Sequence, residues 1–224
     1  MRIAEIFYSV QGEGTLVGVP SVFVRVSGCN LRCSWCDTPY TSWNPEGDEW
    51  TNGAIVTEVA KYPARHVVIT GGEPMLFAPV VELSRQLKDR GLHVTFETAG
   101  TVYQPVSCDL MSISPKLANS TPKESPFAAR HENLRYQPDV LKQLINEFEY
   151  QLKFVVSSKE DVIEIRAIAN AIHAPVDRVL LMPEGTSPER VRERGQWIAE
   201  ICKQEGFRYS PRLHVDLWGD KRGV

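Results

Sequence analysis

The chain has 224 residues, of which 42% are hydrophobic and 24% are charged, and its 25 basic and 28 acidic side chains give a formal net charge of −3. This length and composition predict one globular α/β domain spanning residues 1–224, and they exclude a disordered or fibrous protein. No cluster of lysines or arginines indicates binding to nucleic acid, so a small-molecule substrate is the better expectation.

The N-terminal residues and the number of cysteines indicate a cytoplasmic protein. Residues 1–8 contain the acidic Glu5 and no long apolar run, which argues against a signal peptide. No segment approaches the roughly 20 apolar residues of a membrane span. Five cysteines, an odd number, favour reduced thiols and metal binding over disulfides. We therefore expect a cytoplasmic location, with no membrane partner.

The first half of the chain alternates predicted strands with predicted helices. Strands are predicted at residues 3–9, 21–27, 66–70 and 92–97 from their β-branched and aromatic composition. One helix is predicted at about residues 52–62, and a second carries residues 77–87 with Gly91 as its C-terminal cap. This alternation implies parallel strands joined by crossover connections.

The second half continues the pattern after a long polar segment. Residues 117–137 are predicted to be a loop because they are rich in proline, serine and asparagine. Helices are predicted to begin at Ser158 with Asp161 and at Ser187-Pro188, and Cys202 is predicted to be a core thiol. Further strands are predicted at residues 109–116, 150–156, 179–182 and 207–214, the last of which contains His214.

Five of the predicted strands end in polar or glycine-rich sequence. In a parallel barrel or an open α/β sheet, ligands bind at the carboxyl ends of the strands, so we expect these five ends to line one rim. About six strand–helix units fall short of the eight of a full barrel, which predicts an incomplete (β/α) barrel of about six strands, open on one side. The five ends are the cysteine loop 28–38, Gly71-Gly72-Glu73-Pro74, Glu97-Thr98, Ser114-Pro115-Lys116 and Pro183-Glu184-Gly185.

Three cysteines, Cys29, Cys33 and Cys36, lie within eight positions. Their thiolates can converge from one loop onto a soft metal centre. A structural zinc site needs four protein ligands, but no second Cys-x-x-Cys occurs, the five histidines are scattered, and Cys108 and Cys202 stand alone. Three ligands with one open position suit a cluster that binds a further molecule at its fourth iron. Buried thiols without a ligand role and a zinc loop completed by a distant residue remain alternatives.

The spacing Cys29-x-x-x-Cys33-x-x-Cys36, with Trp35 before the last cysteine, resembles the motif of the radical S-adenosylmethionine superfamily. In that superfamily three cysteines hold a 4Fe-4S cluster, and the amino and carboxylate groups of S-adenosylmethionine chelate its unique iron. The resemblance also implies a cluster loop after the first barrel strand. It implies that S-adenosylmethionine is bound by Trp35, Asp37, Gly72, Glu73, Ser114, Pro115, Lys116, Met182, Pro183 and Glu184, although a methionine at position 182 departs from the expected residue.

Taken together, several segments closely resemble the 7-carboxy-7-deazaguanine synthase family. The most specific part is the Gln-Gly-Glu-Gly loop at residues 11–14 combined with Cys36-Asp37-Thr38. The other matching segments are residues 7–10, Arg25, 70–74, 97–101, 114–116 and 214–219. The family converts 6-carboxy-5,6,7,8-tetrahydropterin into 7-carboxy-7-deazaguanine with loss of ammonia, on the route to 7-deazapurine nucleosides of tRNA such as queuosine.

This resemblance implies roles for the remaining site residues. Arg25 would bind the carboxylate of the pterin, which suits a planar bidentate donor. Thr38 would give its hydroxyl oxygen to a Mg²⁺ ion that bridges to the substrate, although a turn-forming role ahead of Pro39 is the alternative. The other residues expected to bind the pterin are Val10, Gln11, Gly12, Glu13, Thr70 and His214. The family further implies a reducing protein of the flavodoxin or ferredoxin type and a homodimer.

Two rival hypotheses fit the cysteine spacing alone. One is an activase that installs a glycyl radical on a partner protein, but activases lack the Gln-Gly-Glu-Gly loop. The other is a non-catalytic iron-sulfur or zinc protein, which requires a fourth protein ligand.

Overall fold

The computed structural model describes all of residues 1–224 and contains one mixed sheet. The sheet has nine strands in the order β3-β1-β2-β4-β5-β6-β7-β8-β9. All neighbouring pairs from β2 to β9 are parallel, whereas β1 pairs antiparallel with both β2 and β3. The strands are β1 (Arg2–Val10), β2 (Pro20–Val26), β3 (Asp48–Glu49), β4 (His66–Gly71), β5 (His93–Thr98), β6 (Leu110–Ile113), β7 (Tyr150–Val156), β8 (Val179–Pro183) and β9 (Arg208–Tyr209).

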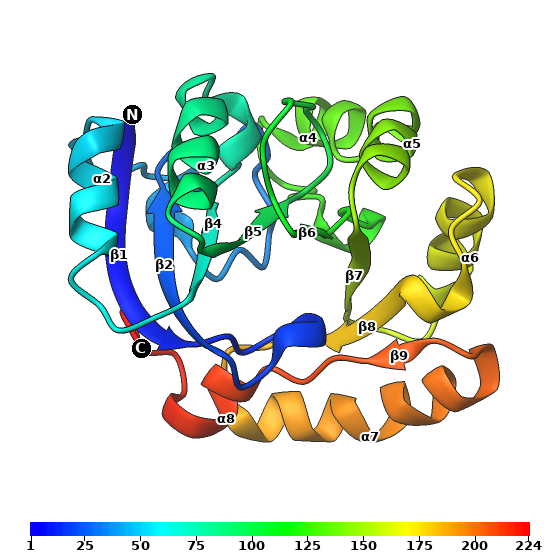
Figure 1. Ribbon diagram of the computed structural model, residues 1–224. Coiled ribbons are helices and arrows are strands. Elements are labelled where there is room, and N and C mark those ends of the chain that lie inside the picture. Colours follow the sequence, from blue (N-terminus) through cyan, green and yellow to red (C-terminus); the bar gives the residue numbers. More distant parts are fainter.

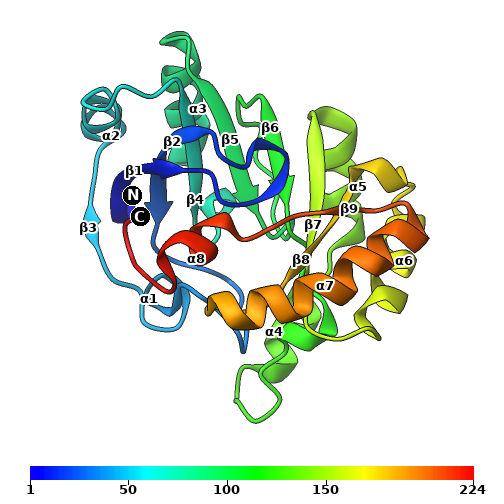
Figure 2. The same ribbon diagram turned by 90° about the horizontal axis from the view of Figure 1, so that it is seen from below.

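The sheet bends into an open arc, and the longer crossover helices cover its outer side (Figures 1 and 2). Six parallel strands of four or more residues, β2 and β4 to β8, form this arc, which confirms the predicted incomplete barrel. No helix combines the length and apolar character that crossing a membrane requires. The helices are α1 (Pro39–Ser42), α2 (Asn52–Val59), α3 (Pro79–Asp89), α4 (Ala128–Leu134), α5 (Pro138–Glu147), α6 (Asp161–Ala171), α7 (Pro188–Glu205) and α8 (Leu213–Trp218), with 3-10 turns at Gly14–Leu16, Pro74–Leu76, Ala118–Ser120 and Val176–Arg178.

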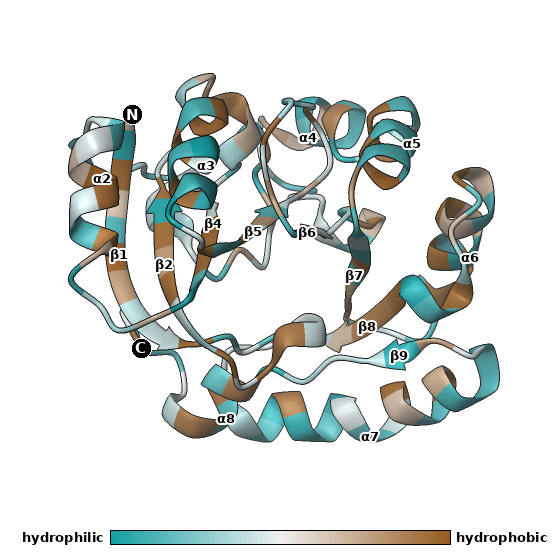
Figure 3. Ribbon diagram, viewed as in Figure 1, coloured by the Kyte–Doolittle hydropathy of each residue, from teal (hydrophilic) through white to brown (hydrophobic).

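Alternating residues of the parallel strands face the helices and the inside of the arc. In β2, Val22, Val24 and Val26 belong to the main hydrophobic core, whereas Phe23 and Arg25 line the cavity inside the arc. This follows from the pleat, which sends successive side chains to opposite faces. The strands are therefore rich in apolar residues (Figure 3), and those that face the helices form the main core. A charged residue within such a strand faces the cavity, which explains the arginine in β2.

Three sequence predictions are wrong in detail. Residues 117–137 contain a 3-10 turn and α4, so they are not a plain loop. The predicted last strand ends at Tyr209, because Pro211 has no N–H for a ladder, and the chain then turns into α8, which carries His214. At α6, Ser158 does not cap the helix; instead the Asp161 carboxylate accepts the backbone N–H groups of Ser157 and Ser158.

The capping predictions for the helices flanking the site are confirmed. Gly91 follows α3 with φ +73, a conformation that glycine adopts without strain. The Ser187 hydroxyl accepts a hydrogen bond from the Arg190 backbone N–H, and Pro188 starts α7. Cys202 of α7 is buried in the main core, as predicted.

Candidate active site

A cavity of about 300 Å³ lies inside the arc at the carboxyl ends of the parallel strands. All of the predicted site residues line it except Glu73, Pro115 and Pro183. The first half of the chain contributes the Gln-Gly-Glu-Gly loop after β1 and the cysteine loop after β2. The second half contributes the ends of β6 to β8, the start of α8 and the C-terminal segment Gly219–Val224. The structure thus brings together segments that lie more than 200 residues apart.

The cysteine loop enters the cavity between two backbone anchors. The Gly28 N–H donates to the Thr41 carbonyl at 2.8 Å, and the Gly28 carbonyl accepts the Glu73 N–H at 2.9 Å. Cys33 packs with Leu31 and Ala99 in a small satellite core, against which Cys29 and Cys36 also pack. Burial raises the pKa of the Cys29 and Cys33 thiols to about 12. Metal binding must therefore displace protons from these sulfurs.

The donor set fits a cluster with an open iron. No three Cys, His, Asp or Glu side chains converge as ligands of a single metal ion, and no fourth such side chain completes a zinc site around the thiols. In a 4Fe-4S cluster each thiolate binds its own iron, so three sulfurs that line one cavity without meeting suit a cluster better than a single ion.

Helix α4 and the turn before it support the cysteine loop from outside. The buried His131 accepts the Arg32 backbone N–H at its Nδ1 at 3.0 Å, and its Nε2 lies 2.9 Å from the Ser120 hydroxyl. On the other side of the loop, the Trp43 indole donates to the Cys33 carbonyl at 3.0 Å. Nothing in the local sequence indicates this role for residues 117–137, because a lone histidine between polar residues has no recognisable pattern.

Glu73 lies beneath the cavity floor. Its carboxylate is fully buried and accepts the Thr98 hydroxyl and the Ala99 N–H, both at 2.8 Å, and the Met75 N–H at 3.1 Å. Burial raises the pKa of Glu73, although these hydrogen bonds oppose the shift. Both carboxylate oxygens of Glu73 accept hydrogen bonds within the protein, so this side chain does not face the cavity. Instead it holds the preceding Gly72 at the cavity wall.

The residues expected to bind S-adenosylmethionine occupy one side of the cavity. The Trp35 indole donates to the Asn119 carbonyl at 3.1 Å, and the Lys116 ammonium lies 5.8 Å from the centre of the Trp35 ring. Lys116 also donates to the Ser114 hydroxyl at 2.8 Å. At the end of β8, Glu184 is paired with Arg190 and Arg194, which leaves it bound to α7.

Buried charges fix the Gln-Gly-Glu-Gly loop on the opposite side. Lys153 of β7 approaches the Glu13 carboxylate to 2.5 Å, Arg212 approaches it to 3.1 Å, and His214 lies 3.9 Å away. Burial alone would raise the pKa of Glu13, but Lys153 and Arg212 hold it well below its usual range. Arg212 also pairs with Asp37 next to the cysteine loop. The two loops are therefore joined through one guanidinium.

Sequence reasoning missed Lys153 and Arg212. Lys153 lies inside an apolar strand, as Arg25 does. Because successive strand residues face opposite sides of the sheet, a charged residue in such a strand indicates a side chain that faces a cavity. Arg212 has no comparable local signal. Glu97, noted only as a strand end, accepts the Gln11 amide at 3.2 Å and the Thr70 hydroxyl at 2.7 Å, so it orients both groups in the cavity.

Thr38 and His214 both reach the cavity. Thr38 occupies the N-cap position of α1 without a side-chain capping hydrogen bond, and its hydroxyl lies 3.9 Å from the Cys36 sulfur. His214 packs against Gly12, where an added Cβ would lie 2.1 Å from its Nδ1. Burial lowers the pKa of His214, which favours the neutral imidazole.

Comparison with known proteins agrees with this geometry. Residues 23–116 match the family model of the radical SAM superfamily. The chain is 45% identical to 7-carboxy-7-deazaguanine synthase of Rhodopirellula baltica, over all of this chain and 89% of the relative, and 44% identical to the Halobacterium salinarum enzyme, over 98% and 91%. The crystal structure of QueE from Escherichia coli has the same fold, with a TM-score of 0.72 and 24% identity over 95% of this chain and 94% of that one.

The fold, the three-cysteine loop and these matches define a radical S-adenosylmethionine enzyme, and such an enzyme uses a 4Fe-4S cluster and S-adenosylmethionine. Within that class, the chain belongs to the 7-carboxy-7-deazaguanine synthase family. This membership confirms the family and enzyme class expected from the sequence. It excludes both rival hypotheses, the glycyl-radical activase and the inert metal protein.

Gly72 offers a test of the contact between the two backbone loops. An added Cβ there would lie 2.1 Å from the Gly28 carbonyl oxygen. We expect Gly72→Ala to displace the cysteine loop, to lower the free energy of unfolding by about 1–3 kcal/mol and to reduce iron content after reconstitution. Gly53 of α2 is the matched control, because an added Cβ meets no atom within 4 Å there. Normal stability and iron content in Gly72→Ala would contradict the close contact.

The depressed pKa of Glu13 predicts a pH-dependent contribution to stability. The ionised carboxylate stabilises the fold above its unfolded pKa of about 4.3, and this contribution is lost as the pH falls toward the lower folded pKa. We expect Glu13→Gln to cost roughly 3 kcal/mol at pH 7 in urea denaturation of the cofactor-free chain. The difference from wild type should shrink between about pH 5 and pH 3. A difference that stays constant over this range would show that the ion pairs with Lys153 and Arg212 contribute little.

Proposed function

We propose that this chain converts 6-carboxy-5,6,7,8-tetrahydropterin into 7-carboxy-7-deazaguanine, contracting the ring with loss of ammonia, and that residues 1–224 do so as one domain. The observation that supports this most directly is that the cysteine loop and the Gln-Gly-Glu-Gly loop line the same cavity. A cofactor bound at the first loop and a substrate bound at the second would therefore be in contact.

The cofactor side of the cavity would be formed by the cysteine loop and the adjacent strand ends. Cys29, Cys33 and Cys36 would hold the cluster, whose one-electron chemistry with S-adenosylmethionine removes a hydrogen atom from the substrate. Because Gly72 has no side chain, its backbone is accessible at the cavity wall, where the methionine part of the cofactor would lie. The ends of β6 and β8 at Ser114–Lys116 and Met182–Glu184 would supply its further contacts.

The substrate side would be formed by polar groups that the protein already orients. Glu97 fixes the Gln11 amide and the Thr70 hydroxyl, so both can hydrogen-bond to the flat edge of a pterin. The backbone of Val10 and Gly12 lies beside them at the cavity. Glu13 would act indirectly, because Lys153 and Arg212 already neutralise its carboxylate.

Arg25 and His214 would also contact the substrate. The Arg25 side chain lines the cavity and is 17% exposed, and its terminal nitrogens donate to no protein acceptor. A planar guanidinium whose terminal N–H groups have no other partner can donate two parallel hydrogen bonds to the carboxylate of the pterin. His214, held neutral and packed on Gly12, would present an imidazole to the bound ring.

We assign Mg²⁺ to Thr38, whose hydroxyl makes no capping bond and accepts only a long hydrogen bond, 3.4 Å, from the Thr41 hydroxyl, so that it could serve as an oxygen ligand. We expect Thr38→Ala to raise the Mg²⁺ concentration for half-maximal activity by about tenfold or more. Thr38→Ser retains the hydroxyl and should stay close to wild type. Equal Mg²⁺ requirements in Thr38→Ala and wild type would remove the assignment.

The partners expected are a reducing protein of the flavodoxin or ferredoxin type and a second copy of the chain. The cluster requires an external electron for each cleavage of its cofactor, which supports the first. The second follows from likeness to the family.

The reaction is tested by anaerobic reconstitution with iron and sulfide, followed by addition of S-adenosylmethionine, Mg²⁺, reductant and 6-carboxytetrahydropterin. We expect mass spectrometry to detect 7-carboxy-7-deazaguanine with wild type and not with Cys33→Ala, which should also bind less iron because it loses one of three ligands. Wild-type protein with a full cluster that forms no deazapurine would disprove the proposed reaction.

A further inference from the structure

Arg25 is held by one edge of its guanidinium and left free at the other. Its Nε donates to the Glu5 carboxylate at 2.7 Å, and the guanidinium carbon lies 5.5 Å from the centre of the Phe7 ring. Phe7 in turn stacks on Phe23 at 5.0 Å between ring centres. Neither terminal nitrogen of Arg25 has a protein acceptor, although the side chain is mostly buried. Four N–H groups therefore point to a ligand or to water in the cavity.

Glu5 stands behind Arg25 and does not line the cavity. It lies directly opposite Arg25 in the antiparallel β1–β2 pair. This pairing depends on a register shift between Ile3 and Glu5, because without the extra residue Ala4 would face Arg25. Bulges of this kind re-aim side chains near binding sites. Glu5 can therefore affect a bound molecule only through the residues that it holds, of which Arg25 is the nearest, at 2.7 Å.

Two further donors prevent Glu5 from turning away. The Tyr40 hydroxyl donates to the same carboxylate oxygen as Arg25, at 2.9 Å, and Arg222 donates to the other oxygen at 3.1 Å. Arg222 also stacks over the Tyr40 ring at 3.9 Å and pairs with Glu46. The C-terminal segment runs back from α8 toward β1 (Figure 1), where Arg222 also donates to the Ala4 carbonyl at 3.3 Å.

We propose that Glu5 is a positioning residue for the substrate carboxylate. Because Glu5 occupies Nε, a carboxylate cannot bind Arg25 side-on through Nε and a terminal nitrogen. Only the end-on geometry with both terminal nitrogens remains, and this fixes where the carboxylate lies relative to the cysteine loop. The inference rests on the proposed function, in which Arg25 meets the carboxylate of the pterin. Tyr40 and Arg222 support this geometry by keeping Glu5 in place.

The test compares two ligands that differ only in the carboxylate, 6-carboxypterin and pterin. Each is titrated by calorimetry into the cluster-loaded protein with S-adenosylmethionine and without reductant, so that no turnover occurs. Wild type should bind 6-carboxypterin with higher affinity than pterin, which is the preference measured here, and Arg25→Ala should bind both ligands with equal affinity. Glu5→Ala should lower the preference by about tenfold or more, because a charge-assisted hydrogen bond that orients the guanidinium is lost. Glu5→Gln keeps an acceptor oxygen and should retain most of the preference.

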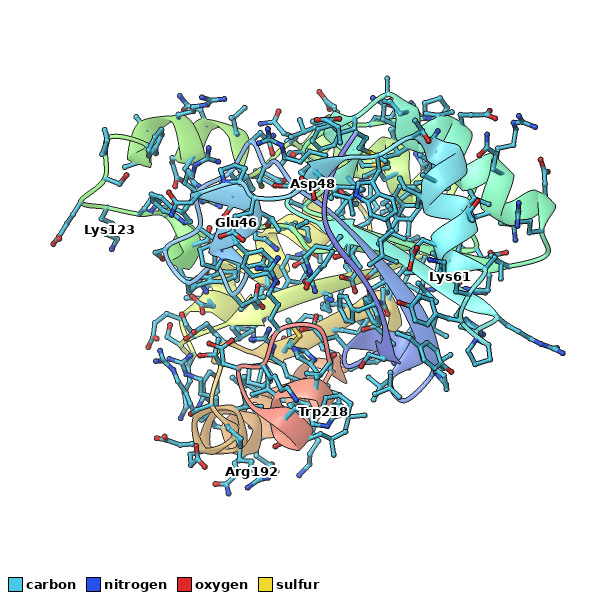
Figure 4. All side chains as sticks on the ribbon, turned by 90° about the vertical axis from the view of Figure 1, so that its left-hand side faces the viewer. Glu46, Asp48, Lys61, Lys123, Arg192 and Trp218 are labelled. Atoms are coloured by element: carbon cyan, nitrogen blue, oxygen red, sulfur yellow. The ribbon has the colours of Figure 1, made fainter.

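The matched control is Asp48→Ala, which removes an exposed acid from the neighbouring strand β3 and should change neither affinity (Figure 4). Because both ligands are measured on one sample, their ratio does not depend on the fraction of folded protein. A wild type without preference would refute the carboxylate role of Arg25, and with it this part of the proposed function. If Glu5→Ala still binds 6-carboxypterin more tightly than pterin to the same degree as wild type, or if it loses the same factor of affinity for both ligands, only the positioning role of Glu5 is overturned.

Discussion

Glu73 joins three consecutive strand ends of the open barrel. Its backbone N–H binds the Gly28 carbonyl at the exit of β2, and its side chain binds Thr98 and Ala99 at the exit of β5, while the residue itself follows β4. A buried carboxylate is costly unless hydrogen bonds satisfy its oxygens, and here three donors do so. The position of the cysteine loop depends on this arrangement, because neighbouring loops at a sheet edge have no ladder to align them.

The opposite side of the cavity depends on charge rather than on backbone contacts. Lys153, Glu13, Arg212 and Asp37 alternate in sign and each pairs with the next, so the buried charges of Lys153 and Arg212 both have partners. Removal of Glu13 would take the nearest partner from the buried Lys153, and removal of Arg212 would leave Asp37 without its ion pair. The cavity thus combines a hydrogen-bonded side with an ion-paired side, which in the proposed function would bind the cofactor and the substrate respectively.

Much of this architecture follows from local sequence patterns. The apolar strands, the glycine and proline caps and the three-cysteine loop each have a physical meaning that holds without knowledge of the rest of the chain. The polar strand ends were predicted to share one rim because parallel strands end at the same edge. The predictions failed for two different reasons. The helix at residues 128–134 brings His131 to the Arg32 amide, a contact 99 residues away that no local pattern reveals. The strand predicted to reach His214 instead ends before Pro211, a local signal that the prediction overlooked.

The residues proposed to bind the substrate, and the partners that hold them, could be predicted only in part from the sequence. Arg25 was identified through family resemblance, but its partner Glu5 depends on a register shift in β1 that no sequence pattern reveals. Likewise Lys153 becomes a site residue only when β7 and the loop after β1 meet across the cavity.

His131 connects the protonation of the protein to the shape of its cysteine loop. Its Nδ1 must be unprotonated to accept the Arg32 amide, and burial lowers its pKa, so the neutral ring is favoured. The loop is therefore held by a hydrogen bond that exists only while His131 is neutral. The lowered pKa preserves this bond at pH values at which an ordinary histidine would already be protonated.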